Sequence, residues 1–251
     1  MPQLQFTSPR FIGDAVLEDI LNDPPAAGTK KLQHGSNATS VTAVQQALFD
    51  MGWNFKANPP VEDETTFVDG DYGPSTERTV LNYKIYFDIH FPSTDPFGLY
   101  DGFAGPATLR HLDTHVVLFD EAVDAINAKV ADLQAAGITV QMPVSNALAE
   151  RTRTVPAAMG AGHLATIDNT PGVIIFKRGV GAFEVHGPIL DRYVASLGPN
   201  GVLGFPTSDE EDDGTGFRRS EFEHGTLRLE VSSGTVDLTG SAATAPDPVL
   251  F

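Results

Sequence analysis

The chain contains nearly the same short sequence phrase twice, VDGDYGPSTERTV at residues 68–80 and YDGFAGPATLRHL at residues 100–112. Each copy runs Asp-Gly, any two residues, Gly-Pro, any residue and then Thr. Proline suits the first position of a helix because its fixed φ matches helical geometry and its missing N–H would have no partner there. Each phrase therefore predicts a turn that leads directly into a helix.

The repeated Asp and Gly residues are the types that tight turns use. An Asp side chain can accept hydrogen bonds from backbone amides just ahead of it, and Gly can adopt a positive φ or allow close packing. We therefore expect a structural role for Asp69, Gly70, Gly73, Thr76, Asp101, Gly102, Gly105 and Thr108. Two copies of the phrase predict a small helical region that is internally duplicated.

Helical periodicity surrounds both phrases. In residues 40–54 the apolar side chains recur at spacings of three and four, with Ser40 as the expected N-cap and Gly52 as the residue that ends the helix. Similar spacings follow each Gly-Pro. The expected helical stripes are Val41, Val44, Leu48 and Met51, then Thr76, Val80, Tyr83 and Phe87, and then Leu109, Leu112 and Val116.

Three segments in order, HGSNATSVTAVQQALFDMGW, DGDYGPSTERTVLNYK and DGFAGPATLRHLD, resemble the peptidoglycan-binding type 1 domain, a three-helix module of wall-directed proteins. The resemblance covers about residues 32–113. It implies an all-α three-helix bundle whose groove, beside the turns and helix starts, holds peptidoglycan. Aromatic faces and hydrogen-bonding side chains hold sugars, so the resemblance implies ligand contacts from Asp71, Tyr72, Ser75, Tyr100 and Phe103. For the three aromatic residues, packing inside the fold is the alternative.

This resemblance has two departures and one extension. The segment YKIYFDIHF replaces the Phe-Gln that often ends the second helix, and the insert KANPPVEDETTFV before the first Asp-Gly turn is long. Both affect the shape of the implied groove. The opening SPRFIGDAVLEDIL also resembles the leader of such domains in proteins encoded beside extracellular contractile injection systems.

The middle of the chain is expected to connect two domains. Residues 117–136 place apolar side chains at helical spacing and are followed by Gly137, which predicts an amphipathic connector helix. Residues 143–171 mix Pro, Gly, Ala, Ser and Thr without a period, which is typical of a linker.

A second motif, Leu203-Gly204-Phe205-Pro206, lies in the C-terminal part. With VHGPILDRYVASLG before it and FEHGTLRLE after it, residues 172–230 resemble the LGFP repeat of actinobacterial cell-surface proteins. The segment GVIIFKRG predicts a buried strand, GPILDRYVASLG a short helix with Ile189, Tyr193 and Leu197 on one face, and GTLRLEV an alternating strand. We expect Phe205 to be buried.

The expected fold class is therefore multidomain. An all-α three-helix bundle resembling the peptidoglycan-binding domain occupies residues 1–116, and a helical connector with a linker occupies residues 117–171. A small α+β domain resembling the LGFP repeat occupies residues 172–240, and a tail occupies residues 241–251.

The composition excludes several classes of partner and chemistry. The 33 acidic and 16 basic residues give a formal net charge of -17, which disfavours nucleic acid and anionic membrane surfaces. The absence of cysteine excludes disulfides and thiolate catalysis. No apolar run is long enough to predict membrane insertion, and the N-terminus shows no evident signal peptide.

Candidate catalytic and metal-binding motifs are weak. His111 and His115 have the i, i+4 spacing of a zinc pair, but the Glu expected after the first His is missing and no third ligand is evident. The stretch from Asp209 to Ser220 resembles a calcium loop but lacks the final Glu, which predicts a solvated acidic loop. We therefore expect no metal, no cofactor and no enzymatic activity. Paired carboxylates for glycoside hydrolysis stay open, because acidic residues are abundant.

The two resemblances together imply a non-catalytic protein that binds peptidoglycan or another cell-wall glycan, outside the cell or at its surface. The alternative is a structural, docking or cargo component of a phage-like contractile injection system. Its partners would be particle or envelope proteins, and its location would be cytoplasmic until particle release. An enzyme site hidden in residues 117–171 is the least favoured alternative, because that region is short and its helical positions are apolar.

Overall fold

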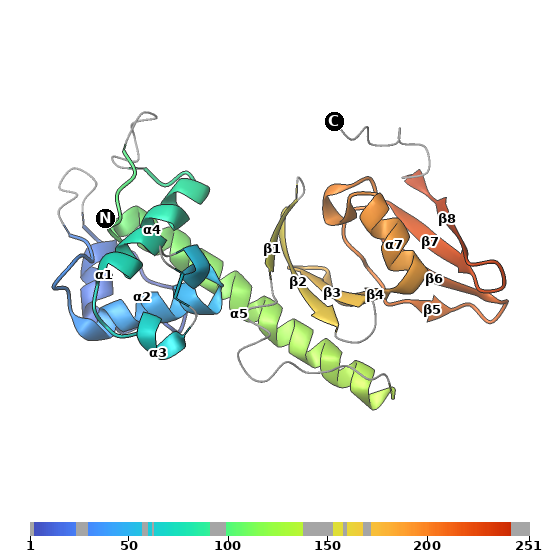
Figure 1. The fold of residues 1–251 in the computed structure, drawn as a ribbon, viewed down its shortest axis with the longest axis horizontal. Helices are drawn as coiled ribbons and strands as arrows, with labels where there is room; N and C mark the ends of the chain where they lie inside the picture. The colour runs from blue at the N-terminus through green and yellow to red at the C-terminus, as the bar shows by residue number, and fades with distance from the viewer. Residues whose placement is uncertain are drawn as a thin grey trace. The chain divides into compact units, whose positions relative to one another are not determined.

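The computed structural model describes residues 3–23, 30–56, 60–61, 63–90, 99–137, 153–157, 160–167 and 172–241. The chain divides into two compact units, Met1–Phe119 and Asp120–Phe251. In the described residues, the first unit is helical, and the second contains the end of a long helix, two antiparallel sheets and a further short helix (Figure 1).

The two repeated phrases begin helices, as predicted. The helices of the first unit are α1 (Ala15–Leu21), α2 (Ala38–Asp50), the 3-10 helix η1 (Trp53–Lys56), α3 (Glu64–Phe67), α4 (Pro74–Tyr86) and the first part of α5 (Pro106–Ala135). Pro74 and Pro106 are the first residues of their helices. The cap of α2 is Asn37, whose side chain accepts hydrogen bonds from two amides, so Ser40 lies inside the first turn instead.

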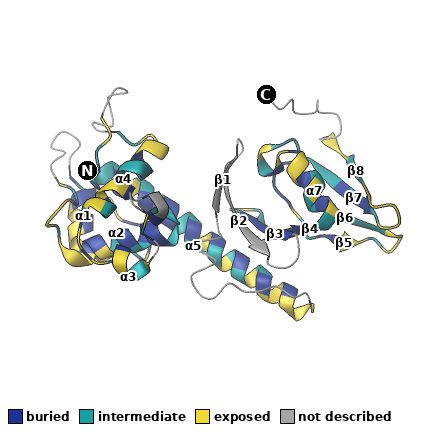
Figure 2. Cartoon of the chain, viewed as in Figure 1, coloured by how far each residue is buried: buried dark blue, intermediate teal, exposed yellow. Residues whose placement is uncertain are grey.

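Helix α5 is one uninterrupted helix from Pro106 to Ala135. We expected a helix up to about residue 116 and a separate connector helix from residue 117, but neither Gly nor Pro interrupts the segment. Its apolar spacing also continues without a break (Figure 2). Gly137, with a φ of 82°, follows the helix as predicted.

The core of the first unit joins the N-terminal segment to the helices. Phe11 and Leu17 are fully buried against side chains of α2, α4 and α5. The predicted stripes are buried at Val41, Val44, Leu48, Thr76, Val80, Tyr83, Leu109, Leu112 and Val116. The carboxylate of Asp113, on α5, accepts hydrogen bonds from the amides of Thr7 and Ser8, which fixes the leader segment to the helices.

The first sheet of the second unit begins earlier in the chain than we predicted. It contains β1 (Arg153–Ala157), β2 (Gly160–Ile167), β3 (Gly172–Lys177) and β4 (Gly181–His186), antiparallel and in that order. Part of the expected linker at residues 143–171 is therefore strand, and the rest lies outside the described residues. Backbone pairing on both sides defines β2, with His163 opposite Thr154 and Phe176, whereas its Gly and Ala residues give no strand signal.

The second sheet consists of β5 (Glu211–Asp212), β6 (Phe217–Phe222), β7 (Gly225–Glu230) and β8 (Thr235–Thr239), again antiparallel and in chain order. Helix α7 (Gly187–Ala195) and the 3-10 helix η2 (Gly198–Asn200) lie between the two sheets in sequence. Leu227 and Leu229 of β7 are buried, as the alternation predicted.

Side chains from both sheets and from α7 form the core of the second unit. Ile175 and Val185 come from the first sheet, Ile189 and Tyr193 from α7, and Leu227 from the second. Leu197 was expected on the same face as Ile189 and Tyr193, but it is 41% exposed. The helix ends before it, and its φ of 69° lies in the left-handed region.

Candidate functional sites

A glutamine of α2 organises the first repeated turn. The Gln45 amide nitrogen donates to Asp69 Oδ1 at 2.9 Å and to Thr76 Oγ1 at 2.8 Å, and its oxygen accepts from the Gly70 amide at 2.9 Å. Asp69 also accepts from the Asp71 amide two residues ahead, as in an Asx turn. Gly70 adopts a φ of 78°. The predicted structural roles of Asp69, Gly70 and Thr76 are visible in these bonds.

A lysine from the preceding helix organises the second turn in the same way. Lys84 of α4 is buried, and its Nζ donates to Asp101 Oδ1 at 2.5 Å. Asp101 also accepts from the Phe103 amide two residues ahead. In both turns, a side chain from a helix earlier in the chain, α2 or α4, holds the Asp that shapes the turn.

Tyr72 connects the two turns. Its side chain is only 2% exposed, and its hydroxyl donates to the Gly102 carbonyl oxygen at 2.7 Å. Burial raises the pKa of Tyr72, so the hydroxyl stays protonated as a donor. Gly102 lies directly against α4: a Cβ there would come within 2.7 Å of the Glu77 carbonyl oxygen.

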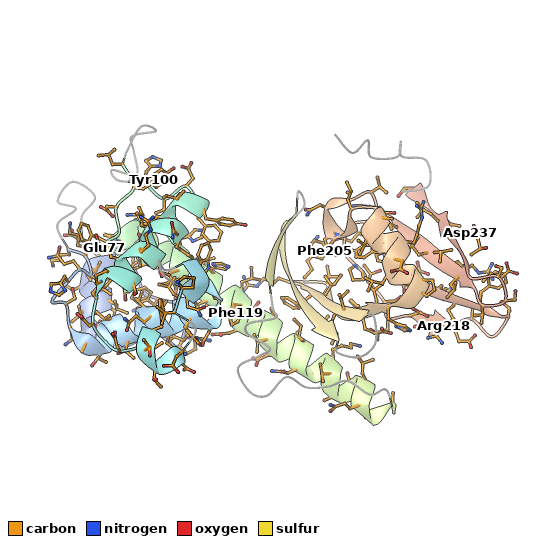
Figure 3. All side chains as sticks on the ribbon, viewed as in Figure 1. Glu77, Tyr100, Phe119, Phe205, Arg218 and Asp237 are labelled. Carbon is orange, nitrogen blue, oxygen red and sulfur yellow. The ribbon has the colours of Figure 1, made fainter. Side chains whose placement is uncertain are left out.

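The five residues expected to contact a ligand fall into different environments. Asp71 is exposed, and its carboxylate lies 3.8 Å from the imidazole of His34. Tyr100 is also exposed, and its hydroxyl donates to Asp88 (Figure 3). Ser75 is half-buried on the first turn of α4.

Two of the three aromatic rings proposed for ligand contact are instead in contact with other parts of the fold. Tyr72 is a correction, because burial and its bond to Gly102 remove its ring from the surface. Phe103 is half-buried, and the Lys31 ammonium lies 3.9 Å from the centre of its ring, a cation–π contact that covers one face. Tyr100 is the predicted aromatic with a ring at the surface.

The two histidines of α5, His111 and His115, lie next to the buried Tyr83. The Tyr83 hydroxyl lies 2.7 Å from His111 Nδ1 and 3.3 Å from His115 Nδ1. Trp53 and Phe87 also pack their rings against Tyr83. Burial lowers the pKa of His111, which favours the neutral imidazole. Within the described ranges, no group of three or more His, Cys, Asp or Glu side chains is arranged to hold a metal ion.

The Leu203-Gly204-Phe205-Pro206 segment is packed against the turn between β6 and β7. Leu203 and Phe205 are fully buried, as predicted for Phe205. Their carbonyl oxygens accept from the amides of His224 and Glu223, and Pro206 forms an isolated bridge with Phe222. The Gly204 carbonyl oxygen accepts from the Tyr193 hydroxyl at 2.8 Å. This segment therefore fixes α7 to the second sheet.

Glu223 holds the same segment from the side. Its carboxylate accepts from the Phe205 amide at 3.0 Å and from Lys177 at 2.6 Å, and Lys177 also lies over the Phe205 ring. Burial raises the pKa of Glu223, but these hydrogen bonds outweigh it and hold the pKa below its ordinary value. A Cβ at Gly204, whose φ is 71°, would come within 2.7 Å of the Glu223 carboxylate.

The acidic stretch after this motif is only partly the solvated loop we expected, because Glu211 and Asp212 are exposed whereas Glu210 is buried. Asp209 pairs with Lys129, Asp213 pairs with Arg228, and the buried carboxylate of Glu210 pairs with Arg218. Of the three basic partners, Arg218 lies on β6, Arg228 on β7 and Lys129 on α5. Asp209, Glu210 and Asp213 therefore each have a basic partner within the fold.

Sequence reasoning missed Gln45, Lys84 and Glu223, each of which organises a turn. The first two lie on α2 and α4, at polar positions next to a predicted apolar stripe. A polar side chain on the buried face of a helix was the available signal. Glu223 offers no comparable signal, because its role depends on the pairing of β6 with β7.

Among the described residues, no helix is long and apolar enough to cross a membrane. No curated protein sequence matches the chain significantly. A family profile described as the LGFP repeat matches residues 203–245, whereas we expected about residues 172–230. The match begins at Leu203 and includes the segment that packs against the β6–β7 turn. Residues 203–245 of the C-terminal unit are therefore similar to the LGFP repeat, a module found in cell-surface proteins.

Proposed function

We propose that this chain is a non-catalytic protein of the bacterial cell envelope. Its helical unit binds peptidoglycan, and its second unit, which contains the LGFP match, attaches the protein to the envelope. The observation that carries the proposal is the LGFP match at residues 203–245, because it connects the chain to cell-surface proteins. The resemblance of residues 32–113 to the peptidoglycan-binding domain supports the choice of ligand.

The geometry of the two turns supports the choice of site. Tyr72 and Gly102 join the turns, so residues flanking either turn border the same junction. Asp71 and Tyr100 flank it with exposed side chains, while Gln45 and Lys84 fix the backbone beneath. Rigid support under exposed polar and aromatic groups is what a site for a flexible glycan strand or stem peptide needs, since it lowers the entropic cost of binding.

Its chemistry fits an uncharged or zwitterionic ligand. The net charge of -17 disfavours polyanions. The Asp71 carboxylate can accept hydrogen bonds from sugar hydroxyls or from an amino group of a stem peptide, and the Tyr100 ring can pack against a sugar face. None of these roles requires a metal, a nucleophile or a proton transfer.

Co-sedimentation of the full-length chain with purified peptidoglycan sacculi tests the proposal. The test variant carries Asp71→Ala and Tyr100→Ala, two exposed positions whose replacement leaves the core intact. The matched control is Asp237→Ala, an exposed acidic residue of β8 (Figure 3). We expect the wild-type and control proteins to pellet with the sacculi and the double variant to stay largely in the supernatant.

Two other results have distinct meanings. If the wild-type and the double variant pellet equally, the wall is bound but not at the two turns. If the wild-type does not pellet, peptidoglycan binding fails, and a protein partner in the envelope or in an injection particle becomes the next hypothesis.

A further inference from the structure

A compact cluster of four ionisable side chains lies at the end of β4, in the second unit. His186, the last residue of β4, places Nδ1 2.6 Å from Glu184 Oε2 and Nε2 3.4 Å from Glu210 Oε2. Arg218 of β6, labelled in Figure 3, pairs with the other oxygen of Glu210. The two glutamate side chains are only 6% and 2% exposed. Two carboxylates are therefore buried around one imidazole.

With both glutamates ionised, the charges in this cluster balance when the imidazole is protonated. Glu184 and Glu210 contribute two negative charges, and Arg218 contributes one positive charge. A neutral His186 leaves one uncompensated negative charge among buried groups, which is strongly unfavourable. A protonated His186 makes the cluster neutral.

Hydrogen bonding leads to the same conclusion. Glu210 Oε2 is buried and receives no hydrogen bond, and the nearby His186 Nε2 is the atom that faces it. A neutral imidazole has one N–H, so either Glu184 or Glu210 would face a nitrogen lone pair. Only the doubly protonated ring presents an N–H to both carboxylates.

The charged groups next to this cluster do not replace that proton. Asp209 accepts a hydrogen bond from the Glu184 amide and pairs with Lys129 of α5, so those two side chains neutralise one another. The hydrogen bond to Glu184 raises the pKa of His186 above its ordinary value, in spite of the opposing effect of burial. This direction agrees with the geometry.

We propose that His186, Glu184, Glu210 and Arg218 form a pH-operated lock in the LGFP-containing unit, closed while His186 is doubly protonated and released when the proton is lost. The lock connects the end of β4, and with it the start of α7, to the segment around β5 and β6. His186 ends β4 and directly precedes α7, and Glu210 and Arg218 belong to the segment around β5 and β6. Tyr193 of α7 in turn holds the Gly204 carbonyl oxygen.

The sign follows from linkage. A His with a raised pKa in the folded state contributes stability that is fully present below the unfolded-state pKa of about 6.5 and is lost as the pH rises through the folded-state pKa. The unit is therefore expected to open more readily in mildly alkaline solution than in mildly acidic solution. An envelope protein would experience such changes directly, although the lock does not depend on the proposed wall binding.

An NMR titration of the histidine rings in the full-length chain is the first test. We expect the His186 ring to titrate above the ordinary value of about 6.5. A His186 pKa at or below about 6.5 overturns the proposal, and this result does not depend on any variant folding.

Amide hydrogen exchange of the same protein tests the consequence. After correction for intrinsic rates, the opening equilibrium of β4 and α7 should increase with pH by a total of about tenfold for each unit by which the His186 pKa exceeds 6.5. His186→Gln should remove this dependence, whereas His34→Gln should retain it. Openings that do not vary with pH in the wild type, or that vary equally in His186→Gln, would refute the lock.

Discussion

The Tyr72 hydroxyl and the Gly102 carbonyl oxygen, thirty residues apart in the sequence, lie 2.7 Å apart in the fold and join the two repeated turns. Both groups are buried, so neither can replace its partner with water. Tyr72, for which the sequence left ligand contact and packing inside the fold both open, thus serves as a fixed connection between the two halves of the duplicated region. The consequences of this arrangement can be measured.

Removal of the hydroxyl should destabilise the helical unit without changing its shape. We expect Tyr72→Phe to lower the free energy of unfolding by about 1 to 2 kcal/mol, because it leaves the buried Gly102 carbonyl oxygen without its donor. Tyr100→Phe removes a hydroxyl bonded to the exposed Asp88 and should cost less than about 0.5 kcal/mol. Urea denaturation followed by the fluorescence of Trp53, the single tryptophan, measures both changes. Equal costs would contradict the structural role of Tyr72.

The two glycines of the second turn should differ sharply in their tolerance of alanine. A Cβ at Gly102 would meet Glu77 Cγ at 2.2 Å, whereas a Cβ at Gly105 has its nearest neighbour at 4.0 Å. Gly102→Ala is therefore expected to destabilise the unit by about 1 to 3 kcal/mol through overpacking. Gly105→Ala should change stability by about 0.5 kcal/mol or less. Thermal unfolding monitored by circular dichroism separates them, and a neutral Gly102→Ala would be inconsistent with the close approach of α4.

Lys84 should contribute more to stability than an ordinary surface lysine. Its side chain is 5% exposed and pairs with Asp101, so Lys84→Met removes the partner of a partly buried carboxylate. We expect a loss of about 2 kcal/mol, less than for a fully buried pair because Asp101 retains access to water. Lys30→Met breaks an exposed pair with Asp19 and should cost about 0 to 1 kcal/mol. The difference can be measured by urea denaturation of the two variants under the same conditions.

Acidification should weaken the contact by which Glu223 holds the Leu203-Gly204-Phe205-Pro206 segment. Its pKa lies below the ordinary value in the folded protein, so its contribution to stability is present above the unfolded-state pKa and is lost as the pH falls through the folded-state pKa. The Phe205 amide donates to this carboxylate and should exchange faster, relative to its intrinsic rate, as the solution is acidified. In the Glu223→Gln variant, the Phe205 amide should exchange fast at every pH, with little dependence on pH. Unchanged protection of Phe205 in acid would contradict this role.

Local signals in the sequence predicted the starts of α4 and α5 and the glycines that follow α2 and α5, but not the helices α1 and α3. Pro74 and Pro106 begin their helices, and Gly52 and Gly137 follow their helix ends with positive φ. These features depend on backbone preferences of single residues, which the sequence displays directly. The α2 cap was placed three residues late because both Asn37 and Ser40 are good caps and the apolar stripe starts after Ser40.

Features that depend on distant pairing were not predictable in this way. Residues 160–167 of β2 are rich in Gly and Ala, and they are strand because β1 and β3 pair with them on either side. Tyr72 presents a pattern that fits either a surface aromatic or a core residue, and only the position of Gly102 decides between them. The cluster around His186 likewise joins residues from separate strands, which no spacing in the sequence reveals.

The side chains that support the two repeated turns are not interchangeable. Gln45 both donates to its turn and accepts from the Gly70 amide, whereas an ammonium group such as that of Lys84 can only donate. A lysine moved into the first turn would leave the Gly70 amide without an acceptor, and a glutamine moved into the second would remove the charge that faces Asp101. Each turn is therefore matched to its own supporting side chain, Gln45 in the first copy and Lys84 in the second.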